Sequence, residues 1–353
     1  MTIPIAYADI FPPDYSVTGI RSKNANNTQV ILTGSCPPSS NITNGMIYSG
    51  PVNPIDPLGI SCVLPKHLGA ITAVFYGPDT PLFNPSIGEE NIRVVGTYRR
   101  SGENYDHGVL YKGPPDGSGE DWKPIDMPDG VAGGKVINTI PHSTMGELIV
   151  GNYEYKDMVT GLDGFGAFIY DINNPGENQY RRLTLEPYKL ITAYGIWQNE
   201  IGSTSYTIAG GLADGSGFNV GYLVDYNSET FQTSNLTTFV FDNTNRNLIT
   251  HFEGITKYGE AMTDFGPRYY SLAATGDQDY ANRGAAFAVV ERLLPDGLFG
   301  DLVWERVKDP NSIGINTGNT VLTNNLFGIY ETVDPNGKKG IQSYMAIIPP
   351  QQA

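Results

Sequence analysis

The residues best suited to acid–base chemistry are His251 and Glu253, in the segment Thr250-His251-Phe252-Glu253. If this segment is a β-strand, residues two apart point to the same face, so the imidazole and the carboxylate are neighbours. Each group then tunes the proton affinity of the other, which suits a general acid or base. A hydrogen-bonded structural pair between neighbouring blades explains the same residues, and the sequence leaves both interpretations open.

Other polar and aromatic residues suggest a site for a flat or apolar ligand. His142 and Arg21 could donate hydrogen bonds to an oxygen on which negative charge develops. Aromatic side chains could form the wall of such a site. The candidates for contact with a substrate are Tyr76, Tyr194, Trp197, Phe252, Glu253 and Asn324. For His142 and Trp197, structural packing is the alternative interpretation.

Motifs for metal or cofactor chemistry are missing from the sequence. On the expected inner strands, Glu253 and Asn324 are the only matching oxygen ligands for calcium, and two are too few without help from loops. The 4 histidines and 2 cysteines nowhere have the spacing of zinc ligands. GxSxG, HExxH, phosphate-loop and dinucleotide motifs are absent as well. We therefore expect neither a metal nor a cofactor.

A sixfold repeat carries these candidates. Short apolar segments recur six times, and each is followed by a segment with a glycine at or before its head. These glycines lie at positions 45, 108, 166, 221, 284 and 340, at spacings of 63, 58, 55, 63 and 56 residues. A repeat of this length that contains several short strands is typical of a propeller or solenoid.

A complete repeat divides into four strands, several segments show clear period-2 alternation, and no stretch carries a long helical stripe. The first strands, which carry every candidate named above, are expected at 16–22, 71–77, 136–142, 191–197, 249–255 and 319–325. Six such repeats predict an all-β, six-bladed β-propeller with four antiparallel strands per blade, in one domain spanning residues 1–353. First strands line the central channel of a propeller, so we expect the site there. Trp122 and Trp304 are expected to pack between blades.

The two ends of the chain complement each other. The last repeat stops at Pro349-Pro350 without a fourth strand, and the segment 3–10 precedes the first repeat without an obvious partner. We expect this segment to complete the last blade and close the ring without an unpaired edge. A disordered tail is the alternative.

Charge and composition exclude several classes of protein. With 22 Lys and Arg against 37 Asp and Glu, the chain has a net charge of −15. Phosphate backbones and anionic bilayers would repel it. No apolar run approaches the ~18 residues of a spanning helix. We expect neither nucleic-acid binding nor membrane insertion, and the oligomeric state stays open.

Several weak signs favour secretion. Glycosylation sequons begin at Asn26, Asn41 and Asn235. Cys36 and Cys62 could form one disulfide, although two buried free thiols fit equally well. The first residues lack the basic and apolar regions of a signal peptide. We expect a secreted protein whose signal peptide lies outside this sequence.

The segments ITAYGIWQ, SYTIAGGLADG, VGYLVDYNSETF and ITHFEGI resemble fungal secreted propeller proteins. That group includes the hetero-Diels–Alderases of tropolone–sesquiterpenoid pathways, and the resemblance covers roughly residues 16–348. It implies the joining of a tropolone-derived quinone methide to a humulene-type alkene. Such a cycloaddition needs an aromatic pocket and a hydrogen-bond donor, but no nucleophile, metal or redox cofactor. The matching segments are strand patterns, so no catalytic residue is carried over.

The expected function is therefore a cofactor-independent hetero-Diels–Alder reaction on apolar small molecules. A secreted carbohydrate-active or carbohydrate-binding propeller, either a glycosidase or a lectin-like protein, is the alternative. A structural or protein-interaction propeller is a third interpretation. Propellers perform all three roles, so the fold cannot choose among them.

Overall fold

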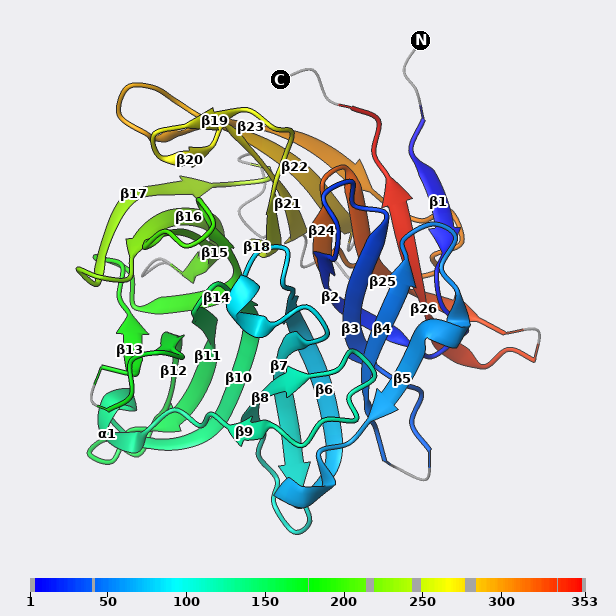
Figure 1. Cartoon of the computed structure of the whole chain (residues 1–353), viewed down its shortest axis with the longest axis horizontal. Helices are drawn as coiled ribbons and strands as arrows, with labels where there is room; N and C mark the ends of the chain where they lie inside the picture. Colours follow the sequence, from blue (N-terminus) through cyan, green and yellow to red (C-terminus); the bar gives the residue numbers. More distant parts are fainter. Residues whose placement is uncertain are drawn as a thin grey trace. The chain divides into compact units, whose positions relative to one another are not determined.

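The computed structural model describes residues 4–39, 42–176, 178–213, 219–242, 249–276, 284–334 and 336–350. Its strands form six four-stranded antiparallel sheets, so the protein is a six-bladed β-propeller as predicted (Figure 1). The chain divides into two compact units, which are described separately. One contains Met1–Thr18 and Gly195–Ala353, and the other is Gly19–Tyr194.

The unit Gly19–Tyr194 carries the first three blades, each with its first strand followed by three antiparallel neighbours. The first blade consists of β2 (Ser16–Ser22), β3 (Gln29–Ser35), β4 (Gly45–Pro51) and β5 (Ile60–Val63). The second consists of β6 (Ala70–Asp79), β7 (Ile92–Arg100), β8 (His107–Gly113) and β9 (Trp122–Pro124). The third consists of β10 (Lys135–Met145), β11 (Leu148–Lys156), β12 (Asp163–Asp171) and β13 (Tyr180–Leu183). The loops of this unit hold the short helices η1 (Pro57–Gly59), η2 (Lys66–Leu68), η3 (Pro85–Ile87) and α1 (Asp129–Ala132).

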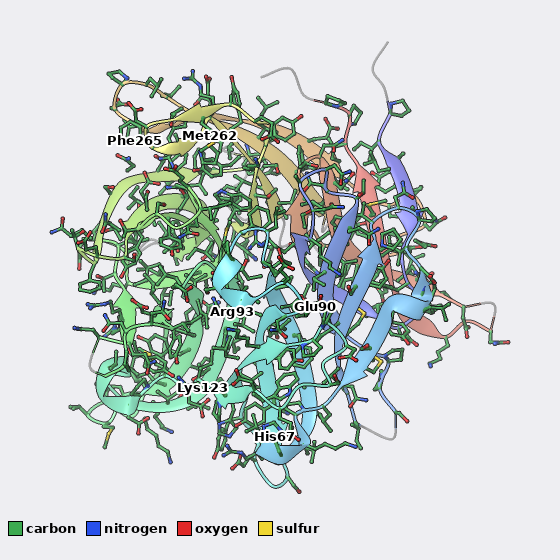
Figure 2. All side chains as sticks on the ribbon, in the orientation of Figure 1. His67, Glu90, Arg93, Lys123, Met262 and Phe265 are labelled. Atoms are coloured by element: carbon green, nitrogen blue, oxygen red, sulfur yellow. A yellow bond between two sulfur atoms is a disulfide. The ribbon has the colours of Figure 1, made fainter. Side chains whose placement is uncertain are left out.

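The other unit carries the last three blades. The fourth consists of β14 (Leu190–Gln198), β15 (Ser205–Ala213), β16 (Asn219–Asn227) and β17 (Gln232–Phe239). The fifth consists of β18 (Thr250–Lys257), β21 (Tyr269–Gly276), β22 (Gly284–Arg292) and β23 (Phe299–Val307). The sixth consists of β24 (Thr320–Leu322), β25 (Asn325–Val333), β26 (Lys339–Ile347) and β1 (Ala6–Asp9). A small hairpin of β19 (Met262–Thr263) and β20 (Gly266–Pro267) lies between β18 and β21 in the sequence, and Figure 2 labels its Met262 and Phe265.

The N-terminal strand completes the sixth sheet. β1 runs antiparallel to β26, with Ala6 opposite Ile347 and Asp9 opposite Tyr344, and the blue and red strands lie side by side in Figure 1. The Gln342 side chain adds a hydrogen bond of 2.6 Å to the carbonyl oxygen of Phe11. The predicted pairing of the chain's two ends is therefore present, over residues 6–9 of the expected 3–10.

Aromatic packing joins neighbouring blades within each unit. Trp122 stacks on Tyr111 and Phe75, with ring centroids 4.2 and 5.4 Å apart, in a buried cluster that includes Ile31 of the first blade. In the other unit Trp304 meets Phe241 at 5.2 Å, just after the fourth blade. Trp122 therefore lies in a core shared with the first blade, as predicted, whereas Trp304 packs on the connection between the fourth and fifth blades and on Phe252 of its own blade.

A disulfide reinforces the first blade. Cys36 follows β3 and Cys62 lies on β5, and the two sulfur atoms are bonded, with 6.0 Å between the Cα atoms. Of the two interpretations that the sequence left open, the structure has the cross-linked one. Such a link stabilises the fold mainly by restricting the unfolded chain.

Candidate functional site

The first strands present an accessible face. On β6 the half-buried Thr72, Val74 and Tyr76 alternate with the fully buried Ala73 and Phe75. The first strand of the fourth blade, β14, shows the same alternation. Because strand side chains point to opposite faces in turn, one face packs in the core and the other is only half-buried.

Three of the predicted site residues meet on this face in the unit Gly19–Tyr194. Tyr76 comes from β6, His142 from β10 and Tyr194 from the first half of β14. The His142 ring centroid lies 4.8 Å from that of Tyr76 and 4.4 Å from that of Tyr194. These are normal contact distances for aromatic rings. The imidazole therefore lies between two phenol rings, in what we call the Tyr76–His142–Tyr194 row.

β-Bulges help to aim two of these side chains. The pairing of β6 with β7 breaks between Phe75 and Pro78, and that of β10 with β11 breaks between Pro141 and Ser143. Tyr76 and His142 lie in these breaks, where an extra residue redirects the strand, as often happens beside functional sites. A proline inside a strand pattern is a sign of a bulge. Pro78 and Pro141 were therefore the sequence signal that could have located both.

Gly77 sets the close approach of β6 to β10. A Cβ atom at this position would lie 2.5 Å from Ser143 Cα and 2.7 Å from the carbonyl oxygen of His142. Any larger residue would push these two strands apart. The spacing between Tyr76 and His142 thus depends on the glycine between them.

The His251–Glu253 pair forms as predicted, in the other unit. His251 Nε2 and Glu253 Oε1 are 2.5 Å apart, and Glu253 lies in a bulge between Phe252 and Gly254. Burial on its own would lower the pKa of His251, but the charge and hydrogen bond of Glu253 outweigh it and raise the pKa above its usual value. The ring therefore holds its proton more tightly than a free imidazole does.

Glu253→Gln should lower the pKa of His251, because the substitution removes the negative charge that stabilises the imidazolium. An NMR titration of the His251 ring proton, assigned with a His251→Asn variant, measures this. Glu260→Gln changes an exposed carboxylate in the same unit and should leave the titration where it is. If both glutamine variants behave alike, Glu253 is not the cause of the raised pKa.

Arg21 does not reach the accessible face. Its side chain is buried, and it donates hydrogen bonds of 3.4 Å to the carbonyl oxygens of Pro78 and Thr144. Burial lowers the pKa of Arg21, and the nearby Asp79 opposes that shift. The structure gives Arg21 the role of tying β2 to β6 and β10, in place of the predicted role as a donor to substrate.

Asp79 is fully buried, and burial raises its pKa to about 6 although Arg21 and Arg93 counteract the shift. Because the folded-state pKa is above the unfolded value of 3.8, ionisation destabilises the fold increasingly as the pH rises from about 4 through 6. Asp79→Asn does not ionise at this position. Its free energy of unfolding should therefore rise by about 2–3 kcal/mol relative to that of wild type when the pH is raised from acid to neutral.

Urea unfolding of Asp79→Asn and wild type at about pH 4 and about pH 7.5 measures this gain. The matched control is Glu90→Gln, which changes an exposed carboxylate in the same unit (Figure 2). A stability difference between Asp79→Asn and wild type that is independent of pH would contradict the raised pKa.

The other predicted contacts lie off the accessible face. Trp197 is 3% exposed and Phe252 is fully buried, because each is an odd number of residues from Tyr194 and His251, respectively, and period-2 alternation turns it to the core. Asn324 lies beyond the short β24, in the turn before β25, where its amide donates 2.8 Å to the carbonyl oxygen of Ile348. These placements correct the expectation that all three line a ligand site.

The sequons differ in their surroundings. Asn26 is exposed in the connection between β2 and β3. Asn235 is half-buried on β17, and its amide donates 2.8 Å to Asp225 Oδ2. Asn41 lies outside the described residues. Glycosylation at these sites stays a prediction, with Asn26 the most accessible of the two described.

The described residues were also compared with the requirements for a metal site and for a membrane-spanning helix, and they meet neither. They contain no cluster of three or more His, Cys, Asp or Glu side chains arranged to hold a metal ion. No helix in the same ranges has the length and hydropathy needed to cross a membrane.

Comparison with known proteins supports the fold. Neither a family model nor a curated protein matches the sequence. Among solved structures, a subtype N11 neuraminidase-like protein of A/flat-faced bat/Peru/033/2010 (H18N11) is similar with a TM-score of 0.50 and 8% identity, over 98% of this chain and 94% of that one. An exo-1,5-α-L-arabinanase from a bovine ruminal metagenomic library matches with a TM-score of 0.38 and 10% identity, over 75% and 94%. An α-L-arabinofuranosidase from Podospora anserina matches with a TM-score of 0.34 and 13% identity, over 74% of this chain and 88% of that one. At 8% identity the likeness to the neuraminidase-like protein concerns the fold alone.

Proposed function

We propose that the protein is a cofactor-independent enzyme acting on flat, conjugated small molecules. Specifically, it would be a hetero-Diels–Alderase that joins a tropolone-derived quinone methide to a humulene-type sesquiterpene in fungal natural-product biosynthesis. The observation that supports this most is the Tyr76–His142–Tyr194 row on the half-buried face of the first strands. In this row the ring centroids of Tyr76 and Tyr194 lie 4.8 and 4.4 Å, respectively, from that of His142. The resemblance of the strand segments supplies the reaction type.

The row has the two features that this cycloaddition needs. Phenol rings offer apolar surface on which a conjugated ring can stack. His142 between them can donate a hydrogen bond to the quinone-methide oxygen as negative charge develops there. The four-atom C=C–C=O unit and the alkene form one C–C bond and one C–O bond, and every atom is retained in the dihydropyran. Holding both partners in a reactive pose supplies the remaining acceleration.

We also propose that the protein is secreted. The Cys36–Cys62 disulfide is consistent with an oxidising compartment, since such bonds persist mainly outside the cytosol. The exposed Asn26 sequon fits the same route.

The direct test generates the quinone methide in situ with humulene, in buffer alone and with purified protein, without added metal or redox cofactor. Chiral chromatography follows the adduct. The proposal predicts faster formation and enrichment of one stereoisomer. The same rate and isomer ratio as in buffer would contradict it.

A carbohydrate-active propeller is the second candidate, because the fold is similar to that of a neuraminidase-like protein and Glu253 offers a half-buried carboxylate beside His251. Most glycosidases use two carboxylates. Of the residues that lie in the bulges of β6, β10 and β18, which include Tyr76 and His142, only Glu253 is acidic. A panel of 4-nitrophenyl glycosides separates the candidates: hydrolysis by wild type and its loss in Glu253→Gln would favour the glycosidase.

A further inference from the structure

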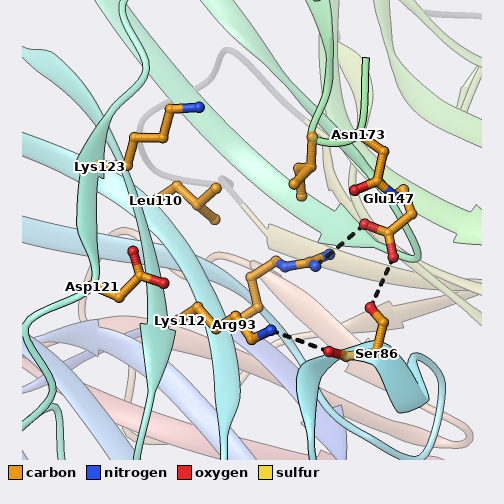
Figure 3. A pocket seen from close by; sticks show the side chains of 9 residues that line it. Ser86, Arg93, Leu110, Lys112, Asp121, Lys123, Glu147 and Asn173 are labelled. Atoms are coloured by element: carbon orange, nitrogen blue, oxygen red, sulfur yellow. Dashed lines mark hydrogen bonds and ion pairs between the residues drawn. The ribbon is translucent and has the colours of Figure 1, made fainter. Parts of the chain in front are cut away.

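A second candidate site lies on the outer strands of the unit Gly19–Tyr194. A cavity of about 400 Å³ opens between the second and third blades, lined mainly by β7, β8 and β9 on one side (Figure 3). The Tyr76–His142–Tyr194 row is on the first strands of their blades and contributes nothing to this lining. The cavity is therefore separate from the site of the proposed reaction.

The cavity gathers positive charge in an acidic protein. Arg93, Lys112 and Lys123 line it from three adjacent strands, with Asp121 and Glu147 as the acidic members. The chain as a whole has 22 basic against 37 acidic residues, so three against two is a local reversal. Arg93 and Lys112 are directly opposite each other in the β7–β8 pairing, and like charges in that position destabilise a sheet.

Within the described ranges, an ion pair neutralises only one of these three cations. Arg93 is almost fully buried and forms an ion pair of 3.3 Å with Glu147, which also accepts a hydrogen bond from Ser86. Lys112 Nζ donates a hydrogen bond of 3.1 Å to the carbonyl oxygen of Ser86 (Figure 3). Lys123 Nζ donates a hydrogen bond of 2.7 Å to the hydroxyl of Tyr170. Both lysines thus have neutral partners.

Neither lysine takes part in an ion pair anywhere in the described part of the chain. Asp121 is exposed on the same wall and forms no such pair there either. An ammonium group with three donors gains most from an anionic acceptor. The lysines are therefore available to an anion that enters the cavity.

The remaining lining is apolar or neutral. Leu110 lies between the two lysines along the wall, opposite Lys123 in the β8–β9 pairing, and Ile172 comes from the third blade. The Asn173 amide lies beside Ile172 and offers both a donor and an acceptor. Charge on one part of the wall and apolar surface on another suit an amphipathic molecule.

We propose that this cavity binds a small organic carboxylate. The carboxylate group would lie near Lys112 and Lys123, and the apolar body of the molecule would pack against Leu110 and Ile172. This goes beyond the proposed cycloaddition, which requires no carboxylate and takes place on the first strands.

The test uses 4-fluorobenzoate and its neutral analogue 4-fluorobenzamide, each followed by ¹⁹F NMR during titration with the full chain. Wild type should bind the carboxylate and prefer it to the amide. The double variant Lys112→Gln/Lys123→Gln should weaken binding of the carboxylate by ~10-fold or more and change binding of the amide little.

The matched control is Lys135→Gln/Lys156→Gln. These lysines are exposed in the same unit, lie opposite each other on β10 and β11, and give the same change in net charge. This control double variant should bind 4-fluorobenzoate with the affinity of wild type. Equal loss in both double variants would reduce the effect to long-range charge and overturn the proposal. Equal affinity for carboxylate and amide, or no binding of the carboxylate at millimolar concentration, would overturn it too.

Discussion

His142→Phe should slow enzyme-catalysed cycloadduct formation about 100-fold, the typical cost of removing one donor to a developing oxyanion. Phenylalanine preserves an aromatic ring between Tyr76 and Tyr194, whose centroids lie 4.8 and 4.4 Å from the imidazole. It removes the ring nitrogens, through which the His142 side chain can donate a hydrogen bond. The loss should therefore appear in kcat, with little change in KM, because the donor acts mainly in the transition state.

The matched control for this substitution is His67→Phe. His67 is exposed in η2 of the same unit and outside the row, so its replacement should leave the rate unchanged. Thermal unfolding of both variants checks that the fold survives. A His142→Phe rate within a few-fold of wild type would show that the imidazole only packs between the two tyrosines.

Asp225→Ala should have the largest effect on stability, a loss of about 3–5 kcal/mol in the free energy of unfolding. The Arg292 side chain is fully buried, and its two terminal nitrogens donate 2.6 and 2.9 Å to the two oxygens of Asp225. One of these nitrogens also donates to the hydroxyls of Thr207 and Tyr270. Without the carboxylate the guanidinium stays buried and lacks its counter-charge, and that desolvated charge is what costs stability.

The control for Asp225→Ala is an ion pair of the same unit in an exposed position. Lys257 and Glu260 are 2.8 Å apart, and the Glu260 side chain is 84% exposed. Glu260→Ala should change stability by less than about 0.5 kcal/mol, since exposed pairs contribute little. Urea unfolding measures both variants. Comparable small losses would show that Arg292 finds compensation when Asp225 is removed.

Much of the blade structure follows from local sequence pattern. Alternating aromatic and β-branched residues with glycines at regular spacing predicted strands that match β2, β6, β10, β14 and β18 to within a few residues. The unfinished last repeat predicted the pairing of β1 with β26. The strands need no knowledge of distant contacts, because each is specified by its own residues, whereas the pairing of β1 with β26 was inferred from the missing fourth strand of the last repeat.

The site was harder to predict because it depends on register and on contacts between blades. Tyr76, His142 and Tyr194 were identified one by one, yet bulges that the period-2 pattern does not contain bring the first two to their places. Phe252 and Trp197 were assigned to the wrong face by the same uncertainty of register.

Interactions between residues far apart in the sequence escaped prediction for a related reason. Arg292 and Asp225 are separated by 67 positions, and nothing in their local segments indicates that they pair. The two cavity lysines likewise occupy ordinary strand segments, and only the pairing of β7, β8 and β9 collects them with Arg93.

A crystal structure of the protein with tropolone, an unreactive relative of the quinone methide, tests the central proposal most directly. We expect the tropolone ring to stack on Tyr76 or Tyr194 with an oxygen within hydrogen-bond distance of a His142 ring nitrogen. Tropolone bound only elsewhere, at a concentration that saturates the protein in solution, would contradict the assignment of the Tyr76–His142–Tyr194 row as the reactive site.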